Sequence, residues 1–188
     1  TYGLISRYGL TPLSWCLDHP GPMVRTVEDA ALTMNAISGY DPKDVGSANV
    51  DIPDFTASMI GDIKNVKIGL VKEFFEAPLD AEVHTVIKTA IAQLEALGAE
   101  IIEVSMPMFE QAQAISGTIL MAEAAAYHRD LLKEHADKLY PPVRLRIESG
   151  LFVTAADYLK AQQGRGLFNK AMSDLFLEVD VLVGPSQP

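Results

Sequence analysis

Cysteine is almost absent from the sequence: Cys16 is the only one in 188 residues. A single thiol excludes an internal disulfide and any multi-thiolate metal site. Such cysteine usage is typical of a reducing compartment, so we expect a cytoplasmic location. None of the four histidines lies in an HExxH pattern or a histidine-rich cluster. We therefore expect no zinc site, and nothing in the sequence indicates any other cofactor.

Basic charge and long apolar runs are also scarce. The 15 lysines and arginines are outnumbered by 25 acidic residues, which gives a formal net charge of −10. Such a surface repels phosphate backbones and anionic headgroups, so we expect no direct nucleic-acid partner and no membrane association. The longest apolar stretch, Ile115 to Tyr127, is interrupted by polar residues. It is shorter than the roughly 20 residues that a membrane helix needs.

Three common fingerprints are missing from the sequence: GxSxG, GxGxxG and GxxxxGK[ST]. Their absence argues against an α/β-hydrolase elbow, a Rossmann dinucleotide site and a P-loop. Cys16 and His19 could be taken for a nucleophile pair, but a lone cysteine is more often a small buried hydrophobe. The composition, 48% hydrophobic and 21% charged, predicts a folded domain. The residues alone predict no self-contained active site in it.

The clearest structural pattern is a strand at residues 67–72, a helix at 81–97 and a strand at 100–104. The helix follows Asp80, carries apolar residues at a 3.6-residue period and stops before Gly98. A crossover of this kind joins parallel strands. We therefore expect an α/β fold with a mixed, largely parallel sheet covered by helices.

The N-terminal third predicts a strand, a helix and a connection. Residues 1–9 resemble a strand. Thr26 and Asp29 form a capping-box pattern for a helix that stops at Gly39. Residues 40–63 are rich in turn formers and predict a surface connection with room for one short helix. This stretch is also where we expect a subdomain edge, if the chain has one.

The C-terminal half predicts two long helices and a final strand. The helical stretches cover residues 110–134 and 155–177 on either side of a Pro-Pro break. Gly164 and Gly166 predict a kink or a break in the second helix, because each costs about 1 kcal/mol relative to alanine. Residues 179–184 predict a buried strand. Since a buried parallel strand needs neighbours on both sides, we expect the parent protein to continue beyond it.

A long ordered motif occupies residues 1–44. It comprises a TYGxxSRxG segment, a CLDxxGPxxRTVED segment and a GxDPxD loop. This order resembles the segment that directly follows the catalytic core of the amidase signature family. Weaker matches, including AEAAAYH, VRLRIESG and VDVLVGPSQP, keep the family's order to the end of the chain. The resemblance therefore implies that residues 1–188 form one partial amidase-signature domain.

The resemblance implies cleavage or transfer of amide nitrogen by a serine nucleophile. In that family a second serine on a cis peptide and a lysine activate the nucleophile, and backbone N–H groups hold the oxyanion. The lysine lies far upstream, and both serines lie just before the TYG segment, so none of the three maps onto this chain. Ser6, Ser14 and Ser186 match no catalytic position. We expect no catalytic residue in the chain and no activity from it alone.

The substrate prediction depends on two departures from the glutamine-using branch, the A subunit of the aminoacyl-tRNA amidotransferase. That branch usually has a tyrosine pair where this chain has Ser116 and Gly117, and adjacent arginines where it reads Arg144, Leu145, Arg146. The departures favour a stand-alone amidase acting on another small-molecule amide. Gly117, Arg144 and Arg146 are then the predicted substrate-binding residues, although a solvated edge is the commoner role for such an arginine pair.

Two other hypotheses stay open. The first is the amidotransferase A subunit itself, which would associate with partner subunits. The second is a non-catalytic α/β binding or scaffold domain, which should have capped sheet edges and no large exposed apolar face. A fragment of an enzyme should instead expose such a face, or form a homodimer through it.

Overall fold

The computed structural model describes residues 2–57, 59–76 and 78–186. Thr1 of the N-terminal motif, and Gln187 and Pro188 of the C-terminal match, lie outside the described residues. No helix in the described part of the chain is long and apolar enough to cross a membrane.

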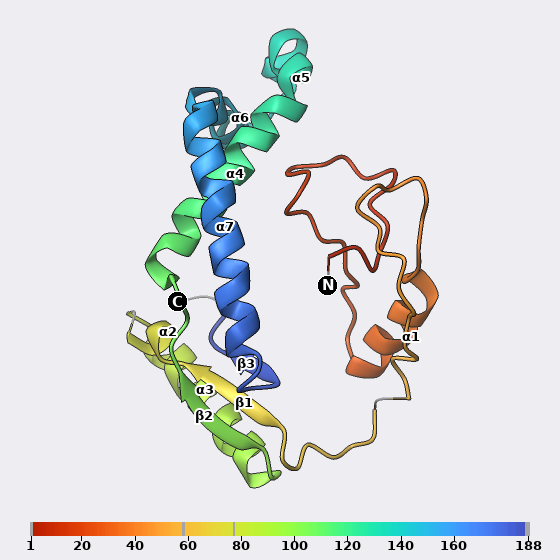
Figure 1. Cartoon of the computed structure of the whole chain (residues 1–188), viewed down its shortest axis with the longest axis vertical. Coiled ribbons are helices and arrows are strands. Elements are labelled where there is room, and N and C mark those ends of the chain that lie inside the picture. The colour runs from red at the N-terminus through yellow and green to blue at the C-terminus, as the bar shows by residue number, and fades with distance from the viewer. Residues whose placement is uncertain (1, 58, 77, 187–188) are drawn as a thin grey trace. The chain divides into compact units, whose positions relative to one another are not determined.

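The chain divides into two compact units, whose elements are labelled in Figure 1. Unit 1 comprises Thr1–Ile60 and Thr118–Ala155, and unit 2 comprises Gly61–Gly117 and Ala156–Pro188. One boundary between them thus falls inside the stretch 40–63. Each unit is described by itself below.

A three-stranded parallel sheet forms the centre of unit 2. β1 (Lys67–Val71) pairs with β2 (Glu100–Val104) on one side and with β3 (Val181–Val183) on the other, in the order β2-β1-β3. The short α2 (Lys72–Glu76) and then α3 (Ala81–Ala96) connect β1 to β2. The predicted βαβ unit and its parallel pairing are confirmed.

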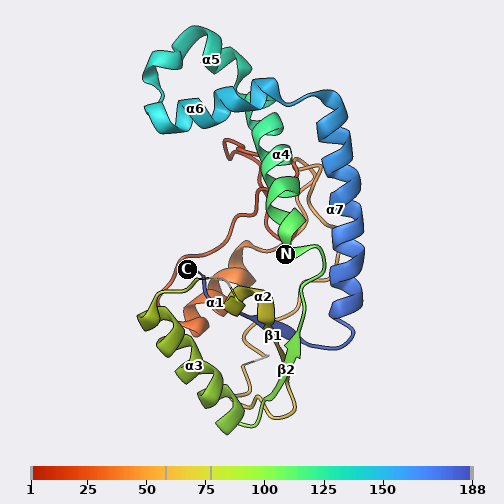
Figure 2. The same ribbon diagram turned by 90° about the vertical axis from the view of Figure 1, so that its left-hand side faces the viewer.

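Helices cover both faces of this sheet. Figure 2 shows α3 on one face and the C-terminal end of α7 (Ala155–Leu175) on the other. On the α7 side, Val71 and Val104 pack with Leu175 and Val179 in a buried apolar cluster. Gly69 belongs to the same layer, because a Cβ there would lie 2.6 Å from the side chain of Leu182. The unit is therefore held together mainly by apolar packing across the sheet.

Two predictions about unit 2 need correction. The helix break at Gly164 and Gly166 is wrong, because α7 is continuous through both. Gly164 instead lets α7 approach Ile115 of α4 (Phe109–Tyr127), whose side chain lies 2.9 Å from where a Cβ would be. The final strand is shorter than predicted and is not buried: Val181 is 46% exposed. β3 lies at one edge of the sheet, where its outer side has no partner strand among the described residues.

Helices and irregular segments make up unit 1. Thr26 caps α1 (Val27–Ile37) by accepting a hydrogen bond from the backbone of Asp29, as predicted. No helix forms between residues 40 and 57. The predicted helix 110–134 is divided at His128, the N-cap of α5, so His128 and His135 do not share one continuous helix. The remaining elements are α5 (Arg129–His135), η1 (Ala136–Lys138), α6 (Pro141–Ser149) and η2 (Gly150–Phe152).

The predicted strand at residues 1–9 is wrong. Its one sheet-like contact is an isolated antiparallel bridge between Ile5 and Ser38. Gly3 and Gly9 have φ angles of 87° and 86°, a left-handed conformation that interrupts an extended chain. The backbone N–H of Arg7 donates to a side chain instead of to a strand.

Gly150 fixes the approach of α6 to α4. A Cβ at Gly150 would overlap the carbonyl oxygen of Met121. That oxygen belongs to the helix backbone and cannot rotate away. Gly150 is also next to the buried cluster of Ala124, Ala125 and Ile147.

We predict that Gly150→Ala destabilises the protein by about 3 kcal/mol, the cost of overpacking against a rigid neighbour. The free energy of unfolding in urea measures this change. Gly166→Ala is the matched control, because nothing lies within 4 Å of the added Cβ. The control should gain about 1 kcal/mol from the higher helix propensity of alanine. A Gly150→Ala protein as stable as wild type would contradict the close approach of α6 to α4.

Candidate functional site

A buried ion pair organises the loops of unit 1. Arg7 Nη2 lies 2.9 Å from Asp44 Oδ1, and Arg7 Nε and N donate to Oδ2 at 3.2 and 2.8 Å. The backbone N–H of Gly46 also donates to Oδ1, at 2.9 Å. The two side chains are only 10% and 3% exposed. Hydrogen bonds from the Arg7 side chain and then its backbone hold the pKa of Asp44 well below its usual range.

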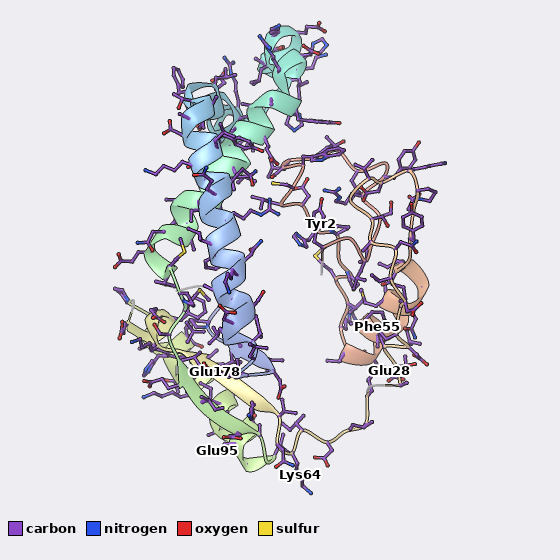
Figure 3. All side chains as sticks on the ribbon, viewed as in Figure 1. Tyr2, Glu28, Phe55, Lys64, Glu95 and Glu178 are labelled. Carbon is purple, nitrogen blue, oxygen red and sulfur yellow. The ribbon has the colours of Figure 1, made fainter. Side chains whose placement is uncertain are left out.

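Aromatic rings pack on the same guanidinium. Its central carbon lies 4.7 Å from the ring centroid of Tyr2 and 5.4 Å from that of Trp15. Figure 3 shows Tyr2 among the loops of unit 1. Arg7 Nη1 also donates to the carbonyl oxygen of Trp15. Arg7 therefore connects the loop segments that carry Tyr2, Trp15 and Asp44.

A second carboxylate, that of Glu123 on α4, holds the loop of residues 12–18. Ser14 Oγ donates to Glu123 Oε2 at 2.6 Å, and the backbone N–H of Cys16 donates to the same oxygen at 3.0 Å. Cys16 Sγ lies 3.0 Å from Oε1. His19 Nδ1 is 2.5 Å from the carbonyl oxygen of Leu17. Neither contact supports a Cys16–His19 nucleophile pair.

The same loop is closed on itself and tied to α4 a second time. Asp18 accepts hydrogen bonds from the backbone N–H groups of Leu13 and Ser14, at 2.8 and 3.1 Å. His128 Nε2 lies 3.0 Å from the carbonyl oxygen of Pro12. The loop is thus anchored from both sides of Leu13.

An apolar groove lies where this loop meets α4 and α6. Its volume is about 160 Å³, it is open to solvent on one side, and Arg146 is the one charged residue among those that line it. The lining residues are Leu13, Leu120, Met121, Ala124, Val143, Arg146 and Ile147. An apolar hollow with one guanidinium suits the apolar part of a small molecule that also carries a hydrogen-bond acceptor.

The three predicted substrate-binding residues have different surroundings. Arg146 lines the groove, whereas Arg144 Nε donates to Glu148 Oε1 at 2.6 Å on a partly exposed surface. Residues two apart on a helix do not face each other, so the two arginines do not form one clamp. Gly117 belongs to the part of α4 that lies in unit 2, and nothing lies within 4 Å of a Cβ added there.

Sequence reasoning missed Leu13, Ser14 and Glu123 as parts of this site. A signal for Glu123 was present, since it is the only acidic residue in the apolar stretch Ile115 to Tyr127. No comparable signal marked Leu13, which is one apolar residue in a loop.

A second pocket in unit 1, of about 180 Å³, lies beside the ion pair. Tyr8, Trp15 and Tyr127 line it, together with Arg7, Asp44, Asp18 and Lys43 among others. Its acidic and basic groups balance, so its charge selects no particular ligand. Among the described residues, no group of three or more His, Cys, Asp or Glu side chains could hold a metal ion.

We predict that Asp44→Asn lowers the free energy of unfolding at pH 7 by about 3 kcal/mol, because Arg7 stays buried without its counter-charge. The depressed pKa of Asp44 stabilises the wild type fully above the unfolded-state pKa of about 3.9. That contribution is lost as the pH falls towards the folded-state pKa. The variant should therefore lose less stability than wild type on acidification below about pH 4.

Urea unfolding at pH 7 and at several values below pH 4 tests this prediction. Asp51→Asn, a change at an exposed aspartate, is the control and should alter stability at pH 7 by less than about 0.5 kcal/mol. Equal stability losses in the two variants would contradict the organising role of the ion pair.

Comparison with known proteins gives consistent matches along the whole chain. The family model described as Amidase matches residues 1–188. An amidase of Pseudomonas putida is 40% identical over 188 residues, which cover all of this chain and 40% of the relative. The A subunit of the glutamyl-tRNA(Gln) amidotransferase of Gloeobacter violaceus is 41% identical over 212 residues, covering all of this chain and 43% of the relative.

The chain spans about two fifths of the length of these curated relatives. Among solved structures, a chain described with a vestigial protein complex and the evolutionary origins of an s-triazine catabolic enzyme superposes with a TM-score of 0.89. It is 28% identical, and the match covers 98% of this chain and 40% of that one. The predicted partial α/β fold is confirmed.

Proposed function

The chain belongs to the amidase family, and we propose that its parent protein hydrolyses a carboxamide bond with a serine nucleophile encoded outside residues 1–188. The observation that carries the proposal is the family match over every residue of a chain that spans about two fifths of its curated relatives. The relatives are longer than this chain, and in the family that the N-terminal motif resembles, the catalytic serines and lysine lie upstream of that motif.

The surroundings of the serines in the N-terminal motif support a nucleophile outside this chain. A serine hydroxyl is a weak nucleophile until a base removes its proton, and it must also reach the substrate carbonyl. Ser14 is fully buried and donates to Glu123, while Ser6 Oγ donates to Asp41 at 2.6 Å. Both hydroxyls are committed to structural hydrogen bonds.

We assign this chain the wall of a small-molecule amide site. Arg146 in the groove would donate hydrogen bonds to a carbonyl or carboxylate of the substrate, while the apolar lining takes its body. Arg144 would have to leave Glu148 to bind a ligand. Gly117 would contribute an open stretch of helix surface that a ligand can approach closely.

The exposed surface favours a part of an enzyme over a self-contained scaffold domain. Large apolar side chains are exposed in both units: Met23, Val45 and Phe152 in unit 1, and Leu177 in unit 2. In our proposal, the rest of the parent or a second copy covers these apolar side chains.

Alignment length favours a stand-alone amidase over the amidotransferase component. The Pseudomonas putida amidase aligns over 188 residues, the length of this chain. The Gloeobacter violaceus relative needs 212 positions, so at least 24 of them have no residue in this chain. The departures at Ser116, Gly117 and Leu145 favour the same choice. We also propose a cytoplasmic location, since one cysteine in 188 residues suits a reducing compartment.

We predict that the full-length parent protein releases ammonia from small carboxamides and that the 188-residue chain does not. The reason is that, in the family that the N-terminal motif resembles, the nucleophilic serine and the residues that activate it lie upstream of this motif. A coupled ammonia assay on both proteins measures the difference, with a mock purification from the same host as control. Turnover that co-elutes with the 188-residue chain and exceeds the mock would contradict the proposal.

The amidotransferase alternative rests on relatives such as the Gloeobacter violaceus protein and is tested with the same full-length protein. If it holds, the parent should co-purify with partner subunits and release ammonia from glutamine preferentially. The stand-alone proposal predicts instead turnover of other amides by the isolated protein, with no dependence on added partner proteins.

A further inference from the structure

Leu13 is a large apolar side chain that the structure holds half-exposed at the edge of the groove. It is 45% exposed and lines the groove opposite residues of α4 and α6. An exposed leucine in a flexible loop would need no explanation. Leu13 differs because the backbone around it is fixed by a set of side-chain hydrogen bonds.

Four contacts restrain the backbone within one residue of Leu13. Its own N–H donates to Asp18 Oδ2 at 2.8 Å, and the N–H of Ser14 donates to Oδ1 at 3.1 Å. The carbonyl oxygen of Pro12 lies 3.0 Å from His128 Nε2. The buried hydroxyl of Ser14 donates to Glu123 at 2.6 Å. Glu123 and His128 both belong to the α4–α5 segment. These contacts therefore fix the position of the loop relative to α4, which also lines the groove.

The other walls of the groove lie on two helices that approach each other closely. Leu120, Met121 and Ala124 are on α4, and Val143 and Ile147 are on α6. The two helices are held together at the close approach of Gly150 to the Met121 carbonyl oxygen. The backbone on both sides of the groove is therefore held in place, and the size of the Leu13 side chain affects the space left for a ligand.

We propose that Leu13 sets the size of the apolar substituent that the enzyme accepts, and that Glu123 is the residue that positions it. The inference rests on the proposed amide hydrolysis. A groove of about 160 Å³ is close to the roughly 150 Å³ that accommodates a benzene molecule in a protein interior. The groove therefore suits carboxamides with an apolar group of about the size of a six-carbon ring, with Arg146 beside it to bind an acceptor oxygen.

The test compares Leu13→Ala and Leu13→Phe in the full-length parent protein. The substrates are acetamide, butyramide, hexanamide, benzamide and naphthamide, and both kcat/KM and Kd by calorimetry are measured for each. One methylene in a hydrophobic pocket changes selectivity by about tenfold or more. Leu13→Ala should therefore move the preference at least about tenfold towards larger amides, and Leu13→Phe should move it towards acetamide.

Leu10→Ala is the matched control. Leu10 lies in the same loop region and is 53% exposed, but it is not among the groove-lining residues. Its replacement should leave the order of preference unchanged. A shift in Leu10→Ala equal to that in Leu13→Ala would overturn the assignment, because it would show a general disturbance of the loop.

Glu123 is tested by Glu123→Ala and Glu123→Gln. Loss of the carboxylate should reduce the differences in kcat/KM between small and large amides, because the loop that carries Leu13 becomes mobile. It should raise KM more than it lowers kcat, because the proposed nucleophile lies outside this chain. Glutamine keeps an acceptor for the Cys16 N–H and should restore part of the preference. An equal loss of rate on every amide in Glu123→Ala would mean a structural role only and would overturn this part.

The two proposals fail in different ways. A wild-type parent that hydrolyses none of the amides contradicts the proposed function, and the Kd order in the Leu13 variants then still decides the present inference. Turnover by wild type with an unchanged order of kcat/KM and Kd in Leu13→Ala and Leu13→Phe contradicts the inference alone.

Discussion

The carboxylate of Glu123 joins two parts of unit 1 that are more than one hundred residues apart in the sequence. On one side is α4, and on the other is a loop that has no regular secondary structure of its own. The hydroxyl of Ser14 is fully buried there, and leaving a buried donor without an acceptor costs about 1–3 kcal/mol. Without Glu123, the loop would lose that acceptor and the register that places Leu13 beside the groove.

The two units are stabilised by different physics. Unit 2 buries branched apolar side chains such as Val71, Val104 and Val179 between a parallel sheet and the end of α7. Unit 1 buries Ile119 and Ile147, but its other buried apolar residues are three alanines, which contribute little hydrophobic free energy. Polar contacts compensate there: the Arg7–Asp44 pair within the loops and the Glu123 hydrogen bonds to α4. Such a network positions the loop accurately. It is also sensitive to the loss of any one partner, so it tolerates few substitutions.

The sequence predicts the elements whose contacts are local, and it fails where the contacts join residues far apart in the chain. The βαβ unit was predictable because Asp80, Gly98 and the apolar period of α3 act within a few residues of one another, and the α1 cap at Thr26 was predictable for the same reason. The N-terminal strand was predicted wrongly because the partner of the Arg7 backbone is Asp44, thirty-seven residues away. Residues 1–9 also contain two glycines whose positive φ no local pattern announces. Of the candidate site, Arg146 was named from the family resemblance, whereas Leu13 and its anchors depend on contacts across more than one hundred residues and have no local signature.

We propose that this chain forms the wall of a serine amidase site and that the nucleophile lies elsewhere in the parent. Covalent labelling of the full-length protein with a serine-reactive fluorophosphonate, followed by peptide mapping, tests that assignment most directly. We predict one stoichiometric adduct on a serine that precedes residue 1, with residues 1–188 unlabelled. A stoichiometric adduct on Ser6, Ser14, Ser186 or any other serine of this chain would contradict it.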